Sequence, residues 1–405
     1  MPQVVPFGKE FRQKYFTNLD SDVTPVNHGS FGLTPDPVFE SYQKNLKRDN
    51  RYPDKYILYN FKDCYSESLT ELSKVLDSPK ENLALVTNAT TAVNVVLRSF
   101  PFKKGDKILI LSTIYGACFN TVKFLENRVG IVPITMILNY PLDDIEIIEM
   151  FEKKLQNENI KLSLFDTVSS MPAARLPFKE LVDLCKKYNC LSLVDGAHSI
   201  GLVKFSLSEL KPDFFTSNLH KWFFTPRPAA FLYVDPKHHK KIHTFPVSHS
   251  YLDDDEILVE PLEKTRYYDR FVFVGSLNYA AYTSVVSAIR FINECCGGLD
   301  NILDYNYNLA AIVGKTIAQR WNTQYLENSK NTLTTAMVNV EVPFYDNAEK
   351  GVFIPIVYHN EKIWARFSAQ IYTELSDFIY AADCFRESFK KFLESELFQE
   401  KFHKI

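Results

Sequence analysis

Two polar residues stand beside strand-like apolar runs and could act on one ligand. Asp195 ends the apolar run of SLVDGAHSIG (192–201), and Lys221 stands in SNLHKWFFTP (217–226), just before a second apolar run. A lysine amine forms a Schiff base with an aldehyde, and a buried carboxylate keeps a ring nitrogen protonated. Each residue alone also has an ordinary structural role, as a solvated lysine or a helix cap. The chemical interpretation therefore depends on the residues that accompany them.

Pyridoxal 5'-phosphate (PLP) needs both groups, and the chain supplies the other parts of a site for it. A helix N-terminus binds a phosphate through its backbone N–H groups and its dipole, and the turn Ala89, Thr90 and Thr91 has the small hydroxyl residues typical of such a site. Tyr115 is the candidate ring to stack on the pyridine. Arg366 is the candidate to bind a substrate carboxylate through two charge-assisted hydrogen bonds. The pattern therefore predicts a PLP enzyme acting on a small amino acid.

The segments around these residues alternate between strand-like and helical patterns. Strand-like runs cover 82–87, 107–113, 161–168 and 191–196, and helical spacing covers 66–78, 88–100, 143–155 and 178–188. This alternation predicts an α/β fold with a parallel sheet and helices on both faces. Ligands in such sheets lie beyond the carboxyl ends of the strands, where Asp195, the 88–91 turn and Tyr115 are expected. After about residue 285, longer helices and a few strands predict a smaller α+β domain.

Composition excludes several other classes of protein. The 405-residue chain has a formal net charge of −3, so no basic excess indicates a nucleic-acid partner. The seven cysteines show no CxxC spacing, so we assign no metal and no disulfide framework. No apolar run is long enough to span a membrane, and the N-terminus lacks the apolar region of a signal peptide. We expect a cytoplasmic protein, and a nuclear location stays open.

The motifs VDGAHSIG and SNLHKW, with the earlier NATTAVN, resemble the class V aminotransferase group of fold-type I PLP enzymes. Four further segments resemble its isopenicillin-N-epimerase-like branch: VNHGSFGLTP (26–35), DTVSSMPAARLP (166–177), FPVSHSY (245–251) and FVGSLNYAAY (273–282). The resemblance implies a large PLP-binding domain (51–282) with a mostly parallel seven-stranded sheet. It also implies a small C-terminal domain (283–405), an N-terminal segment (1–50) over the active site, and a homodimer.

The resemblance also assigns roles to single residues. It implies that Asp195 pairs with the pyridine nitrogen, that His198 lies near the phenolic oxygen, and that Asn218 and the 89–90 turn hold the phosphate. A partner subunit would add a Gly-Thr pair, which here reads Gly275-Ser276. The remaining residues implied to contact the cofactor or the substrate are His220, beside the lysine, and Asn27, His28 and Gly29. His249 is a weaker candidate for the substrate, and a structural role is equally open.

The cofactor does not determine the reaction, because one PLP adduct supports several outcomes. Cysteine desulfurases of this fold need a nucleophilic cysteine in the small domain, and the chain has none between 297 and 383. The flanking motifs resemble the C–S lyases of ergothioneine synthesis, which cleave hercynylcysteine sulfoxide, so we expect such a lyase with Lys221 as the base at Cα. An aminotransferase or epimerase shares every cofactor residue and stays open, as does a non-catalytic relative. The segments 48–60 and 245–255 are expected to contact the substrate side chain.

Overall fold

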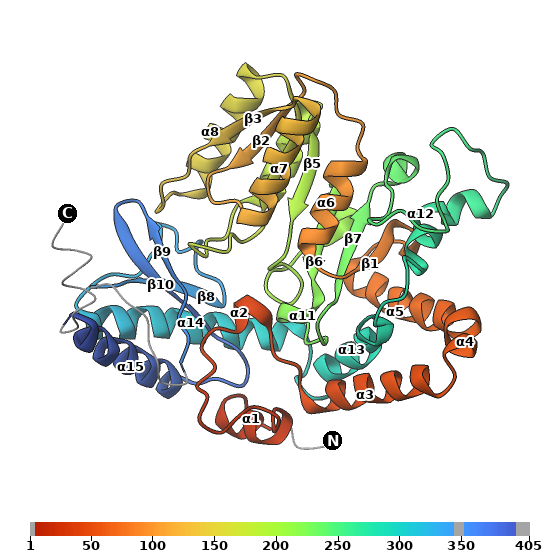
Figure 1. The fold of residues 1–405 in the computed structure, drawn as a ribbon. Helices are drawn as coiled ribbons and strands as arrows, with labels where there is room; N and C mark the ends of the chain where they lie inside the picture. Colours follow the sequence, from red (N-terminus) through yellow and green to blue (C-terminus); the bar gives the residue numbers. More distant parts are fainter. Residues whose placement is uncertain (1–4, 344–351, 394–405) are drawn as a thin grey trace.

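A large and a small β-sheet organise the chain in a computed structural model, which describes residues 5–343 and 352–393 (Figure 1). The large sheet has seven strands in the order β1-β7-β6-β5-β4-β2-β3, and all neighbouring pairs are parallel except those made by β7. The strands are β1 (Leu83–Val86), β2 (Lys107–Leu111), β3 (Val132–Met136), β4 (Ile160–Asp166), β5 (Leu191–Asp195), β6 (Phe214–Asn218) and β7 (Ala230–Val234). The predicted α/β fold with a mostly parallel seven-stranded sheet is confirmed.

Alternating strand residues pack against helices on the two faces of this sheet. One face meets α6 (Ala89–Ser99), α7 (Gly116–Val129) and α12 (Leu262–Val272) through residues such as Ile110 and Leu193. The other face meets α5 (Phe61–Leu76), α8 (Asp144–Asn157) and α9 (Phe178–Lys187) through residues such as Leu109 and Val194. Figure 1 shows α6 and α7 in front of the sheet. Because successive side chains of a strand point to opposite faces, apolar runs such as LSLV cover both layers.

The small sheet has the order β8-β10-β9, with both pairs antiparallel. Its strands are β8 (Met337–Glu341), β9 (Ile356–His359) and β10 (Lys362–Ser368), and it packs with α14 (Leu299–Trp321) and α15 (Leu375–Leu393) around a separate apolar core. The few strands and longer helices that were predicted after about residue 285 are therefore present. The domain boundaries at 50 and 282 stay a prediction.

The remaining helices lie in the N-terminal part and in the connections between strands. The N-terminal part contains α1 (Lys9–Tyr15), α2 (His28–Phe31), α3 (Asp36–Arg51), α4 (Pro53–Lys55) and η1 (Tyr56–Asn60). The rest contains η2 (Lys80–Asn82), α10 (Leu207–Leu210), α11 (Leu219–Trp222), η3 (Pro236–Lys241), η4 (Tyr279–Ser284) and α13 (Val285–Glu294). Of the helices in the described part of the chain, none is long and apolar enough to cross a membrane.

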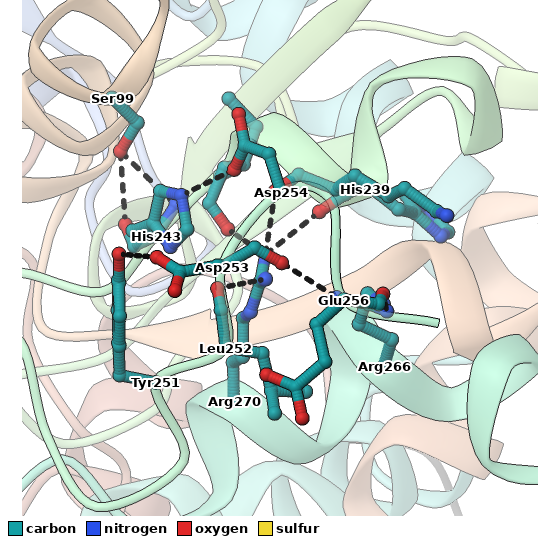
Figure 2. Close-up of polar contacts among 12 residues, drawn as sticks. Ser99, His239, His243, Tyr251, Leu252, Asp253, Asp254, Glu256, Arg266 and Arg270 are labelled. Carbon is teal, nitrogen blue, oxygen red and sulfur yellow. Dashed lines mark hydrogen bonds and ion pairs between the residues drawn. The ribbon is translucent and has the colours of Figure 1, made fainter. Parts of the chain in front are cut away.

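Two buried arginines of α12 hold the segment between η3 and α12. Arg270 donates to the carbonyl oxygens of His239, Lys240, Ile242 and Leu252 at 2.9–3.0 Å, and Arg266 donates to that of Glu256 (Figure 2). Both arginines are at most 2% exposed. Buried carbonyl groups need hydrogen-bond donors, and the two guanidinium groups supply them where the chain forms no sheet or long helix.

Candidate active site

Three neighbouring strands of the large sheet end in polar residues. Asp166 ends β4 and lies directly beside Asp195 at the end of β5 in the parallel register, and Asn218 ends β6. All three side chains are buried, at 3–6% exposure. Because parallel strands place their carboxyl ends at one edge of a sheet, the topology brings these groups to one place.

Lys221 lies in α11, the short helix that follows β6, and its amine points to the same sheet edge. Its Nζ lies 3.0 Å from Nε2 of His198. Burial, with the charge of Arg366, lowers the pKa of Lys221 to about 8, and Asp195 and Asp166 oppose this shift. An amine with such a pKa is half unprotonated near pH 8, whereas an ordinary lysine is almost fully protonated there, and this suits both a nucleophile and a base.

The two carboxyl groups differ in their hydrogen bonds. Asp195 accepts from the backbone N–H of Ala197 at 3.0 Å and from the thiol of Cys118 at 3.2 Å. Burial raises the pKa of Asp195, and burial together with the charge of Asp195 raises the pKa of Asp166 well above its usual range. The Oδ2 atom of Asp166 has no hydrogen-bond partner. Two buried carboxyl groups therefore lie side by side, one of them with an oxygen that has no partner, and a ligand with a protonated ring nitrogen complements them.

The N-terminus of α6 faces this pocket. Asn88 caps the helix, with its Oδ1 accepting the N–H of Thr91 at 2.8 Å, and Asn218 Oδ1 accepts the N–H of Ala89 at 2.9 Å. The helix has eleven residues, and its capped N-terminus carries the partial positive charge that binds a phosphate group. Tyr115, which is half-exposed at 50%, precedes α7 and borders the same space.

These groups enclose a cavity of about 260 Å³. Its lining comprises Ser30, Phe31, Asn88, Ala89, Thr90, Tyr115, Asp166, Ser170, Asp195, Ala197, His198, Asn218, His220 and Lys221. The residues fit PLP: a lysine amine, an acid, a helix N-terminus and an aromatic ring line one cavity. Among the described residues, no group of three or more His, Cys, Asp and Glu side chains could hold a metal ion.

Arg366 reaches this region from β10 of the small sheet. It is 2% exposed and donates to the carbonyl oxygen of Ser170 at 3.0 Å, to Asn27 Oδ1 at 2.8 Å and to Ser30 Oγ at 2.6 Å. Its Nε has no partner, and burial lowers its pKa to about 10. A guanidinium carries five N–H donors, and the two that remain are the Nε–H and one on Nη1. They lie on different edges of the group, so a carboxylate can take one of them but not both at once. Ser30 and Ser170, which it contacts, both line the cavity.

The N-terminal segment crosses over Lys221. The ring of His28 is buried, with Nε2 at 2.5 Å from the carbonyl oxygen of Lys221 and Nδ1 at 2.5 Å from the hydroxyl of Tyr372. A carbonyl accepts only, so Nε2 donates and Nδ1 accepts. Gly32 has a φ of +69°, and a Cβ there would collide with the carbonyl oxygen of His220. Only glycine allows this close crossing.

This arrangement bears on the predicted substrate contacts. Both nitrogens of His28 are engaged, and a Cβ on Gly29 would meet the side chains of Met337, Ser368 and Trp222. Neither residue lines the cavity, and neither does Asn27, whose Oδ1 accepts from Arg366. Direct substrate contact by Asn27, His28 and Gly29 stays a prediction.

Other predicted residues lie outside the cavity of a single chain. Gly275 has a φ of +126° and open space around it, and Ser276 lines a surface hollow with Lys47 and Phe273. The ring of His249 lies 6.1 Å from that of Phe273. The 48–60 and 245–255 segments also do not line the cavity. A role across a dimer interface for Gly275 and Ser276 stays a prediction, as does the homodimer itself.

Several residues of the site were absent from the sequence-based set. Asp166 ends β4 as Asp195 ends β5, so the same strand-end signal pointed to it. Ser30 and Ser170 lie within the motifs that carried the family resemblance, but nothing in those motifs distinguished them. Cys118 and Trp222 contact Asp195 and His198, and both look like ordinary apolar core residues in the sequence.

Comparisons with known proteins show the family to which the chain belongs. The aminotransferase class-V family model matches residues 33–354. A hercynylcysteine sulfoxide lyase from Schizosaccharomyces pombe is 28% identical over 94% of this chain and 97% of its own length. A putative L-cysteine desulfhydrase from Oryza sativa is 30% identical over 88% of this chain and 77% of its own length. A solved structure of C-DES, with glycine covalently linked to its PLP cofactor, has a TM-score of 0.77 at 16% identity and covers 92% of this chain and 98% of its own.

The chain belongs to the class V aminotransferase family of PLP-dependent enzymes. The predicted family, fold type and cofactor are confirmed, and so is the expectation of an enzyme. The cofactor and substrate roles of single residues are proposals drawn from the geometry above.

Proposed function

We propose that this class V aminotransferase family member is a PLP-dependent C–S lyase of ergothioneine biosynthesis. Its substrate is a cysteine sulfoxide conjugate, hercynylcysteine sulfoxide, which it cleaves by β-elimination. Elimination releases a sulfenate and 2-aminoacrylate, and 2-aminoacrylate takes up water to give pyruvate and ammonia. A thiol forms only where a separate reductant, such as a second thiol, then reduces the sulfenate. One observation carries the chemistry: the buried Lys221 amine, with a pKa lowered to about 8, shares a cavity with Asp195 and lies close to Arg366. The similarity to the fission-yeast lyase along nearly the whole chain supports the substrate.

Lys221 has two tasks in this scheme. Its amine holds the cofactor aldehyde until the substrate amine replaces it, and the freed amine then removes the proton from the substrate Cα. Bound PLP supplies an electron sink for the charge that this step leaves at Cα. Proton transfer by a positioned side chain contributes typically 10²–10⁴-fold to the rate.

Other side chains position the reactants. Asp195 holds a proton on the ring nitrogen, and the Cys118 thiol and the Ala197 N–H fix its two oxygens in place. The capped N-terminus of α6 and Asn218 hold the phosphate. Arg366 binds the α-carboxylate with one of its remaining donors and its positive charge, and so fixes the direction of the Cα–H bond relative to Lys221.

The leaving group distinguishes this reaction from its relatives. A desulfurase needs a cysteine thiol to take the sulfur, and the sequence between 297 and 383 contains none. Of the cysteines in the described residues, Cys118 is the one that contacts a site residue, and burial raises its pKa far above the thiolate range. That thiol is a hydrogen-bond donor rather than a nucleophile. Elimination from Cβ requires no such group.

The test is pyruvate release by the purified PLP-loaded enzyme from hercynylcysteine sulfoxide, from other S-substituted cysteine sulfoxides and from free cysteine. Fast, selective release from the hercynyl compound supports the proposal. Equal release from every conjugate reduces it to a general C–S lyase, and preference for free cysteine favours the desulfhydrase activity for which the rice relative is named. A Lys221→Ala variant that keeps full turnover contradicts the role of Lys221.

An aminotransferase or an epimerase is the alternative, because either uses the same cofactor residues. Each leaves the Cβ–S bond intact and gives a keto acid or an inverted amino acid. Incubation without pyruvate release, but with loss of the amino group or of optical activity, would favour one of them.

A further inference from the structure

Trp222 follows Lys221 in the chain, and its indole ring is completely buried beside His198. The indole N–H donates to Nδ1 of His198 at 3.1 Å. An indole nitrogen is a donor only, so the histidine nitrogen that it contacts must be an acceptor without a proton.

This contact determines the tautomer of His198. A neutral imidazole carries one proton, so with Nδ1 accepting, the proton lies on Nε2. That nitrogen is 3.0 Å from Nζ of Lys221. His198 therefore donates to the lysine, and an ammonium group cannot accept because it has no lone pair. The hydrogen-bond directions require an unprotonated Lys221 amine.

The surrounding charges favour the same protonation states. His198 is 2% exposed, and burial, aided by the charges of Lys221, Arg366 and the neighbouring histidines, lowers its pKa well below the usual value. Burial and Arg366 lower the pKa of Lys221, while Asp195 and Asp166 raise it. A neutral His198 that donates from Nε2 therefore faces a Lys221 amine whose pKa is below its usual value, because burial and Arg366 outweigh the two carboxyl groups.

We propose that Trp222 is a positioning residue whose N–H holds His198 in the tautomer that donates to Lys221 and thereby keeps that amine unprotonated. The tautomer follows from the contacts alone. Its consequence for the reaction rests on the proposed role of Lys221. Joining an amine to the cofactor aldehyde forms a C=N bond and releases water, and it needs the unprotonated amine.

Trp222→Phe tests the proposal, because phenylalanine keeps an apolar ring and removes the N–H. The full-length enzyme, stripped of PLP, is reloaded at a series of pH values, and the absorbance of the lysine-bound cofactor gives the rate. In the wild type we expect the rate to rise with pH around a midpoint near 8, because burial and Arg366 lower the pKa of Lys221 to about 8. In the variant, His198 is free to carry its proton on Nδ1 and accept from a lysine ammonium. We expect the midpoint to rise by roughly one pH unit, the size of one hydrogen bond to a charged group.

Trp364→Phe is the matched control. Trp364 is 2% exposed, and its indole N–H donates to the carbonyl oxygen of His359 at 3.0 Å, in the small sheet. It loses the same group from a buried indole, and we expect its midpoint to stay at the wild-type value. An equal shift in both variants would mean that the effect is a general consequence of losing a tryptophan, and would overturn the proposal.

A double-variant cycle tests whether Trp222 acts through His198. The Trp222→Phe shift should disappear in a His198→Ala background, because no imidazole remains to change its tautomer. The same shift in both backgrounds, or no shift in a folded Trp222→Phe variant, overturns the proposal. If Lys221→Ala still forms the lysine-type absorbance, the proposed function fails instead.

Neutron diffraction of the full-length wild-type enzyme without PLP, in which the Lys221 amine is free, tests the tautomer without any variant. Deuterium on Nε2 of His198 and none on Nδ1 is the expected result. Deuterium on Nδ1 overturns the proposal even if every variant fails to fold.

Discussion

Replacing Arg366 with lysine separates substrate binding from the general electrostatics of the site. Lysine keeps the positive charge but presents a point charge instead of a planar fork of five donors. In the structure, three of those donors are taken by Ser170, Asn27 and Ser30, so the substrate carboxylate relies on one of the other two, the Nε–H or one on Nη1. The variant keeps a cation in place and loses that directed bond.

The expected size follows from that loss. One hydrogen bond to a charged group is worth about 1.5–3 kcal/mol, which corresponds to a decrease in kcat/KM of roughly 10–150-fold. If Arg366 only holds the carboxylate, KM rises and kcat is unchanged. If it also fixes the Cα–H direction, as we propose, kcat falls as well.

Steady-state pyruvate release measures both constants, and a substrate whose α-carboxylate is replaced by a primary amide provides the decisive comparison. The Arg366→Lys penalty should be much smaller with the amide, because the interaction has already been weakened. Arg12→Lys is the control, since Arg12 pairs with Asp377 at 3.0 Å and does not line the cavity. An equal loss with acid and amide would refute carboxylate binding by Arg366.

Three further outcomes follow from buried polar groups. Asp213 accepts from His238, Lys237 and Ser192, and these bonds outweigh burial and lower its pKa to about 2. The ionised carboxylate therefore stabilises the fold above pH 4. This contribution of about 2 kcal/mol is lost as pH falls towards 2. Acid unfolding of Asp213→Asn should therefore differ from wild type less at pH 2 than at pH 6. Asp166 has the opposite effect on stability, because its raised pKa means that the folded state loses stability as the carboxyl ionises with rising pH. In the cofactor-free enzyme, Asp166→Asn should therefore raise Tm at pH 8 and have no effect near pH 3. A lower Tm at pH 8 would contradict this. Arg270→Ala should lower the free energy of unfolding by about 3–5 kcal/mol, because four carbonyl groups lose their donor. It should also expose residues 243–262 to limited proteolysis. An unchanged cleavage pattern would show that other contacts hold the segment.

The parts of the site that stand at the ends of strand-like runs could be predicted from local patterns. Asp195, the 88–91 turn and Tyr115 each follow such a run, so the rule that ligands lie at strand carboxyl ends was enough to bring them together, and the chemistry of the cofactor added Lys221. Arg366 was harder because it comes from the small sheet, and it was proposed from the need for a group that binds a substrate carboxylate rather than from a strand-end pattern. Its buried position and its contacts with Asn27 and Ser30 depend on packing between distant segments.

The direction of hydrogen bonds is what sequence patterns could not supply. His28 was expected to approach the substrate, yet its ring nitrogens are occupied by Lys221 and Tyr372, residues far from it in the chain. Asp166 has the same strand-end position as Asp195, but its lack of a partner becomes visible only when its neighbours are placed.

Trp222 shows why this information matters for chemistry. In the sequence it is one of several aromatic residues after Lys221, and its complete burial agrees with a core role. Its single polar atom nevertheless faces the one nitrogen of His198 that can fix the proton on the opposite side of the ring. A residue can therefore belong to the apolar core and still determine which atom in the cavity carries a proton. The size of a side chain predicts the first property, and only the contacts of its polar atom reveal the second.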